Sequence, residues 1–205
     1  IDTLIKVEEV KLANFIFELK EETQQTSRLF LGNPGTGKTH ALSNTVDIHL
    51  NRSNSPAIII RAKDTPCSDW TLIFKKSLEL DGWEKNQVLS AFETLAIRND
   101  NREARAKKLN PGEEFNQEPT KVVICIDGLE EDTAHWQDWY GRLRESFGLM
   151  KSYPRVRFIY SARKYFLNEN QIPDVAGFKV THLPDEGDVP IFQVIDNYFS
   201  PEHYN

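Results

Sequence analysis

One stretch of this 205-residue chain, Gly32–Thr39, constrains its fold more than any other. It reads Gly-Asn-Pro-Gly-Thr-Gly-Lys-Thr and fits the pattern G-x-x-x-x-G-K-[ST]. The apolar run Arg28–Leu31 before it is typical of a buried strand, and Thr39–Leu50 after it carries apolar residues close to helical spacing. The pattern therefore has the strand on one side and the helix on the other that a phosphate-binding loop requires.

The residue types of this loop suit a polyphosphate. Glycines let backbone N–H groups converge on the phosphates, and the following helix adds its positive N-terminal end. Lys38 is expected to reach the β- and γ-phosphates and the Thr39 hydroxyl to bind Mg²⁺. The residues expected to bind the nucleotide are Asn33, Pro34, Gly35, Thr36, Gly37, Lys38, Thr39 and His40.

A second motif ends the apolar run Lys121–Asp127. An aspartate at the tip of a strand beside the strand that precedes the loop can hold Mg²⁺, directly or through water. This is the Walker B arrangement, and it predicts that Asp127 and Thr39 form the metal site.

Two carboxylates follow Asp127 at a distance that suits a general base. Either Glu130 or Glu131 can orient the attacking water or accept a proton from it. We favour Glu131 as the base, with Glu130 supporting the metal site or a neighbouring subunit. The alternative is a solvated helix N-terminus, where carboxylates are favoured in any case.

A cation follows the next expected strand, in Phe158-Ile159-Tyr160-Ser161-Ala162-Arg163. Arg163 is positioned to sense the γ-phosphate and to stabilise charge in the transition state. The alternative is a surface arginine paired with a carboxylate. Ser161 is a weaker candidate for a contact near the same phosphate.

Taken together, these motifs resemble the STAND class of P-loop ATPases. The class pattern is an apolar strand, Asp, Gly, any residue and two acidic residues; Asp127, Gly128, Glu130 and Glu131 match it, with Glu130 where Asp is more usual. Arg163 matches the arginine that the class carries after the following strand. The resemblance covers most of residues 28–165 and is nearest to bacterial antiviral STAND proteins.

That resemblance implies a regulatory switch that uses ATP and Mg²⁺. The domain would lie in a longer chain, between an N-terminal effector and a C-terminal sensor of a phage protein. Target recognition and ATP would drive homo-oligomerisation and activate the effector. The chain starts at Ile1 rather than Met, so we expect a domain excised from a longer protein.

The order of apolar runs predicts strands that alternate with helices. This order indicates an α/β fold, a P-loop NTPase three-layer sandwich with a mainly parallel central sheet and helices on both faces. We expect an N-terminal helix and connector over residues 1–27, the core over 28–185, and the start of a following helical segment over 186–205. Ligands should bind beyond the carboxyl ends of the strands.

The charge, the cysteines and the lack of long apolar runs indicate in which cellular compartment the chain works and which partners it has. The cysteines, Cys67 and Cys125, are isolated in sequence, and no apolar run is long enough to span a membrane. These features predict a cytoplasmic domain without a membrane partner. The net charge of −6 argues against direct nucleic-acid binding by this domain.

Two other functions remain open. The basic stretch from Arg98 to Lys108 is either a solvated helix end with a surface loop, which we favour, or a binding patch. As a binding patch it would suit a DNA-directed AAA-like ATPase, such as a loader or a transposition helper. A module that binds nucleotide without hydrolysing it is the third alternative.

Overall fold

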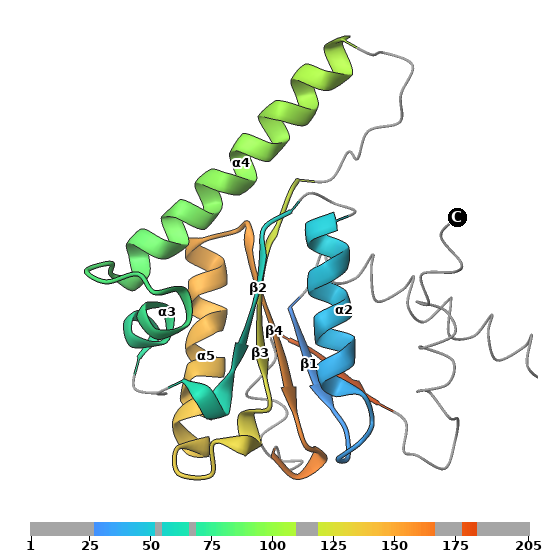
Figure 1. Cartoon of the computed structure of the whole chain (residues 1–205), viewed down its shortest axis with the longest axis vertical. Coiled ribbons are helices and arrows are strands. Elements are labelled where there is room, and N and C mark those ends of the chain that lie inside the picture. Colours follow the sequence, from blue (N-terminus) through green and yellow to red (C-terminus); the bar gives the residue numbers. More distant parts are fainter. Residues whose placement is uncertain (1–26, 52–54, 66–68, 110–118, 167–177, 184–205) are drawn as a thin grey trace, which may run out of the picture.

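A computed structural model of the chain describes residues 27–51, 55–65, 69–109, 119–166 and 178–183 (Figure 1). The strands are β1 (Arg28–Leu31), β2 (Ala57–Arg61), β3 (Val122–Asp127), β4 (Val156–Ala162) and β5 (Lys179–His182). The helices are α2 (Lys38–Asn51), α3 (Trp70–Leu78), α4 (Lys85–Leu109) and α5 (Trp136–Ser152). Short 3₁₀ turns follow three of the strands: η1 (Ala62–Asp64), η2 (Leu129–Glu131) and η3 (Lys164–Phe166).

The five described strands form one sheet in the order β2-β3-β4-β1-β5, and every pair is parallel. The predicted parallel α/β architecture is confirmed. One detail of the prediction is wrong, because the strand that ends at Asp127 is not beside β1. Strand β4 lies between them and pairs with both. Chain order does not fix spatial order in a parallel sheet, since each crossover can pass over a neighbouring position.

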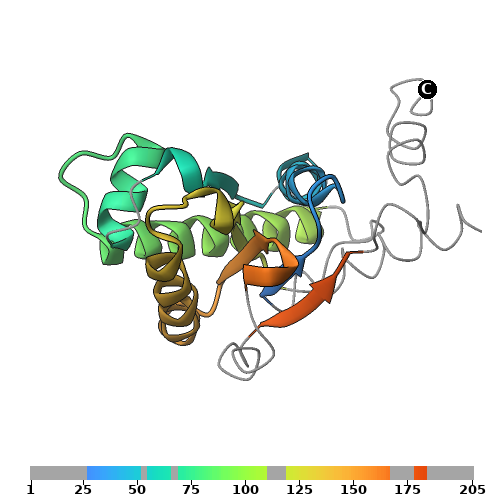
Figure 2. The ribbon, with the colours of Figure 1, turned by 90° about the horizontal axis from the view of Figure 1, so that it is seen from below.

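The two faces of the sheet are covered by different helices, as Figure 2 shows, so the domain has three layers. Alternate residues of a strand point to opposite faces. In β3, Ile124 and Ile126 pack in the cluster that includes Trp70 and Trp139 of α3 and α5. Their neighbour Cys125 packs in the cluster that includes Leu42 of α2. Every residue of β3 is buried, as expected for a strand covered on both faces.

The helix α3 is capped at its start by the side chain of Asp69. The carboxylate of Asp69 accepts a hydrogen bond from the backbone N–H of Leu72 at 3.0 Å, and Asp69 itself is extended. This contact satisfies one of the N–H groups that a helix leaves free at its N-terminus. Trp70, Ile73 and Phe74 then bury one side of the short helix.

Two helices differ from the sequence patterns. The apolar period in α4 ends at Ala96, but the helix runs on to Leu109, and its last eight residues, 102–109, all have high helix propensity. In α5, Trp139 and Leu143 are fully buried, whereas Trp136 is 41% exposed and Phe147 is 40% exposed. Helical spacing of the four residues predicts that all of them face the core, and this is wrong for Trp136 and Phe147 because only one stripe of α5 meets the sheet.

Some expected elements lie outside the described residues. They are the N-terminal helix, apart from Ser27 at the end of its connector, and the helical segment expected from residue 186. Within the described part of the chain, no helix combines the length and the apolar character that crossing a bilayer requires.

Candidate active site

A cavity of about 480 Å³ opens at the edge of the sheet where the strands end. All of the predicted site residues line it except Asn33, Thr36 and the weaker candidate Ser161. Ser43 and Gly128 line it as well. Parallel strands bring their carboxyl ends to one edge, which is why residues more than a hundred positions apart meet here.

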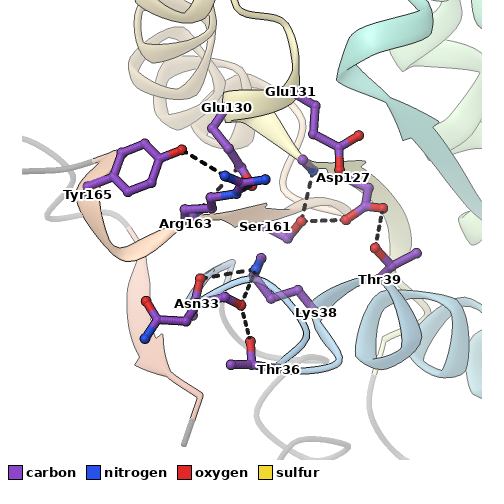
Figure 3. Close-up of polar contacts among 12 residues, drawn as sticks. Asn33, Thr36, Lys38, Thr39, Asp127, Glu130, Glu131, Ser161, Arg163 and Tyr165 are labelled. Carbon is purple, nitrogen blue, oxygen red and sulfur yellow. Dashed lines mark hydrogen bonds and ion pairs between the residues drawn. The ribbon is translucent and has the colours of Figure 1, made fainter. Parts of the chain in front are cut away.

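The loop between β1 and α2 is shaped by its own contacts. Gly35 and Gly37 have φ angles of 84° and 78°, in the left-handed region that favours glycine. The buried Thr36 donates its hydroxyl hydrogen to the Asn33 carbonyl at 2.9 Å. Asn33 and Thr36, which do not line the cavity, therefore stabilise the curvature of the loop (Figure 3).

The ammonium of Lys38 lies over this loop. It donates to the carbonyl oxygens of Gly32 and Asn33, at 3.0 and 2.9 Å. An ammonium has three N–H donors, so one more hydrogen bond can be made toward the cavity. Burial lowers the pKa of Lys38, and the nearby Glu130 carboxylate acts in the opposite direction.

The two predicted metal ligands meet across the cavity wall. The Thr39 hydroxyl donates to Oδ2 of Asp127 at 2.8 Å. The other oxygen of Asp127, Oδ1, accepts a hydrogen bond from the hydroxyl of Ser161 on β4. Asp127 is only 9% exposed, and both of its oxygens are satisfied (Figure 3).

Glu130 is committed to Arg163. Its Oε1 lies 3.2 Å from the guanidinium Nε of Arg163, and its Oε2 accepts from the backbone N–H of the same residue at 3.1 Å. The Glu130 side chain is 6% exposed, whereas that of Arg163 is 37% exposed. Arg163 also donates through Nη1 to the hydroxyl of Tyr165 at 3.2 Å. The guanidinium is thus held at the cavity wall from two sides.

Glu131 has a different environment. Its side chain is 42% exposed and its Oε2 lies 3.3 Å from Nζ of Lys63, which follows β2. Gly128 has a φ of 68°, and a Cβ at this position would lie 2.9 Å from Cδ of Glu131. The absence of a side chain at Gly128 therefore leaves room for Glu131 to fold over the end of β3.

The donor set fits Mg²⁺ bound together with a phosphate. Mg²⁺ prefers oxygen ligands and is usually held by one or two protein groups plus phosphates and water. Thr39 and Asp127 supply two such oxygens on the cavity wall. Among the described residues, no group of three or more His, Cys, Asp or Glu side chains could hold a metal without further ligands.

Sequence reasoning missed Lys63 and gave Ser161 a different role. Lys63 lies 68 positions before its partner Glu131. The sequence signal that could have linked them is that both follow parallel strands, whose carboxyl ends lie at the same edge of the sheet. Ser161 was expected near the phosphate, but its hydroxyl contacts Asp127. No local pattern in the sequence pointed to that contact, because it joins the ends of two separate strands.

Comparison with solved structures finds chains of low sequence identity that superpose on this one in part. The Cdc6p of Pyrobaculum aerophilum superposes with a TM-score of 0.45 at 12% identity, over 89% of this chain and 44% of that one. The Orc1 protein of Aeropyrum pernix, in complex with DNA, gives 0.45 at 17% identity, over 87% and 44%. Drosophila ORC bound to DNA gives 0.46 at 15% identity, over 85% and 41%. This chain thus spans less than half the length of each.

No protein-family model matches the chain, and its sequence matches no curated protein. The assignment of the fold therefore rests on the chain's own parallel sheet, on its strand order and on the loop after β1.

The geometry at Gly128 predicts the cost of replacing it. In Gly128→Ala, a left-handed φ and a Cβ close to the Glu131 side chain should together lower the free energy of unfolding by at least about 1–2 kcal/mol. Urea denaturation measures the change. Gly148→Ala is the matched control, because it lies within α5 where a Cβ has nothing within 4 Å, and it should stabilise the protein by about 0.5–1 kcal/mol. Equal effects of the two substitutions would contradict the account of Gly128.

Proposed function

We propose that this chain is an ATP-binding and ATP-hydrolysing domain. The observation that carries the proposal is the convergence, on one cavity, of the loop after β1, the hydroxyl–carboxylate contact of Thr39 with Asp127, and a cation and a carboxylate at neighbouring strand ends. A loop of this kind requires a strand before it and a helix after it, and both are present.

The loop and the start of α2 would bind the phosphates. Backbone N–H groups at the N-terminus of a helix form an anion site, and Lys38 adds a full positive charge beside it. Thr39 and Asp127 would hold Mg²⁺, which would neutralise negative charge on the phosphates during the reaction. The preference for ATP over other nucleotides rests on the resemblance to the STAND class.

The contacts of the two glutamates favour Glu131 as the general base. Both oxygens of Glu130 are taken by Arg163, and its side chain is almost fully buried. Glu131 is more exposed, and its ion-pair partner among the described residues is the partly exposed Lys63, an interaction that costs little to break. Glu130 would then act through Arg163, by keeping the guanidinium at the cavity wall.

In the proposed reaction, a water oxygen forms the new bond to the γ-phosphorus as the bond to the β–γ bridging oxygen breaks. The leaving ADP takes that electron pair, and the proton of the water passes to Glu131. Arg163, just after β4, and Lys38, at the start of α2, both line the cavity and would stabilise negative charge on the phosphates.

Substitutions at three positions test this assignment. Lys38→Ala should abolish nucleotide binding or hydrolysis, because the phosphates lose their nearest full positive charge. Glu131→Gln should lower turnover by about 100-fold or more and leave ATP affinity within about threefold, since it removes only the proton acceptor. Steady-state ATPase assays and binding of a fluorescent ATP analogue measure the two quantities.

Glu130→Gln is the matched control for the base. It has the same change of charge one residue away and should reduce turnover less than Glu131→Gln does. A larger loss in Glu130→Gln would reverse the assignment of the two glutamates. Unchanged turnover in both variants would favour a domain that binds nucleotide without using these residues for hydrolysis, and normal turnover in Lys38→Ala would refute the site altogether.

We further propose that the domain is the switch of a STAND-type protein in antiphage defence. The support is the run from Asp127 to Glu131 and the arginine after β4, which match the class pattern. A phage protein would be the trigger, and the output would be an effector elsewhere in a longer chain. Size analysis of the full-length protein should show an oligomer only with trigger and ATP, and a monomer under those conditions would contradict this role.

A second candidate function, a DNA-directed ATPase, is favoured by the outward face of α4. The second half of this helix extends past the start of the strands, at the end of the domain away from the cavity (Figure 1). Arg98, Arg102 and Arg105 are exposed there and lie about one turn apart. Asp100, on another side of the helix, contacts Arg155 and the backbone of Thr120 in the body of the domain. The basic groups are thus segregated toward solvent.

Charge reversal separates this candidate from the first. If the face binds DNA, replacing all three arginines by glutamate should abolish DNA-stimulated ATP hydrolysis. The slope of the logarithm of the DNA-binding constant against the logarithm of salt concentration should also become shallower by about 3. The control carries the same change of charge at Lys76, Arg144 and Lys151, which are exposed on α3 and α5. An ATPase rate of the unmodified protein that DNA at low salt leaves unchanged would remove this candidate.

A further inference from the structure

The end of β4 holds the end of β3 through one buried hydroxyl. Ser161 is fully buried, and its Oγ makes two hydrogen bonds across the strands. It accepts from the backbone N–H of Gly128 at 2.9 Å and donates to Oδ1 of Asp127 (Figure 3). Because a hydroxyl has a single hydrogen to donate, this hydrogen is committed to the carboxylate.

These contacts determine which oxygen of Asp127 faces the cavity. The terminal torsion of an aspartate is broad, so an unrestrained carboxylate can rotate. With Oδ1 bound to Ser161, Oδ2 is the oxygen that faces the Thr39 hydroxyl at 2.8 Å. The carboxylate is therefore fixed before any cation binds, and no rotational freedom has to be lost at that step.

The strand order explains why β4 performs this task. Strand β4 lies between β1 and β3, and Ser161 is paired with Phe30 of β1 on one side. On the other side, Ser161 and Asp127 each come one residue after the last paired residues, Tyr160 and Ile126. The hydroxyl thus continues the β3–β4 ladder at the point where its backbone bonds stop.

We infer that Ser161 is a positioning residue for the metal site. It orients Asp127 toward Thr39 and so raises the affinity of the site for a divalent cation, without touching the cation or the nucleotide. This inference rests on the proposed function, since the cation is the one that accompanies the phosphates. Polar partners that orient a metal ligand typically contribute 10- to 100-fold to metal affinity.

Metal affinity can be measured separately from activity. The probe is Mn²⁺ in place of Mg²⁺, added to the 1:1 complex of the protein with a nonhydrolysable ATP analogue, with free Mn²⁺ followed by its EPR signal. Ser161→Ala should weaken Mn²⁺ binding by at least about 10-fold. Affinity for the analogue in EDTA should stay within about twofold, because the loop residues are unchanged.

Two further variants distinguish positioning from general stability. Ser146→Ala is the matched control: it also removes a fully buried hydroxyl, which contacts Tyr160 on β4 away from the cavity, and it should leave Mn²⁺ affinity unchanged. If Ser161→Ala does not fold, Ser161→Cys preserves the size of the side chain but donates weakly, and it should show the same loss of Mn²⁺ affinity.

Different outcomes would refute the role of Ser161 and the proposed ATPase function. Wild-type Mn²⁺ affinity in a folded Ser161→Ala or Ser161→Cys variant would overturn the positioning role and leave the proposed function standing. An equal loss in Ser146→Ala would also overturn it, because the effect would then follow from any buried hydroxyl. If the unmodified protein bound neither the analogue nor Mn²⁺, the proposed function would fail and this inference with it.

Discussion

The site depends on one geometric constraint, the parallel direction of β1, β3 and β4. Because the three strands run the same way and pair in register, their carboxyl ends reach the same edge of the sheet. The loop after β1, the acidic turn after β3 and the arginine after β4 are therefore neighbours, although each comes from a different part of the chain. If one of these strands ran in the opposite direction, its polar residues would lie at the far edge.

Burial of charge at this edge explains much of the local hydrogen bonding. A buried carboxylate is costly unless it is paired or accepts hydrogen bonds. Asp127 meets this requirement through Thr39 and Ser161, and Glu130 through two contacts with Arg163. Glu131 is more exposed to water, so its charge requires fewer hydrogen bonds from the protein. It is therefore the carboxylate that can exchange its partner most easily. The division of roles that we propose for the two glutamates thus rests on their difference in burial.

Local patterns in the sequence predicted the loop, the pairing of Thr39 with Asp127 and the parallel sheet. These features depend on residues close together in the chain, such as a glycine-rich turn between an apolar run and a helix, or an aspartate at the end of an apolar run. The position of β4 between β1 and β3 could not be predicted, because it depends on the path of the crossovers. The same holds for the pairing of Lys63 with Glu131, which joins turns after two separate strands. The exposure of Trp136 depends on which stripe of α5 meets the sheet, and aromatic spacing alone does not determine this.

The proposed site can be tested by a crystal structure of the protein with Mg²⁺ and a nonhydrolysable ATP analogue. The triphosphate should lie along the loop from Gly35 to Thr39. The ion should lie between Oγ1 of Thr39 and Oδ2 of Asp127, with Oδ1 of Asp127 still bonded to Ser161. A nucleotide bound elsewhere, or an ion that contacts neither Thr39 nor Asp127, would contradict the account.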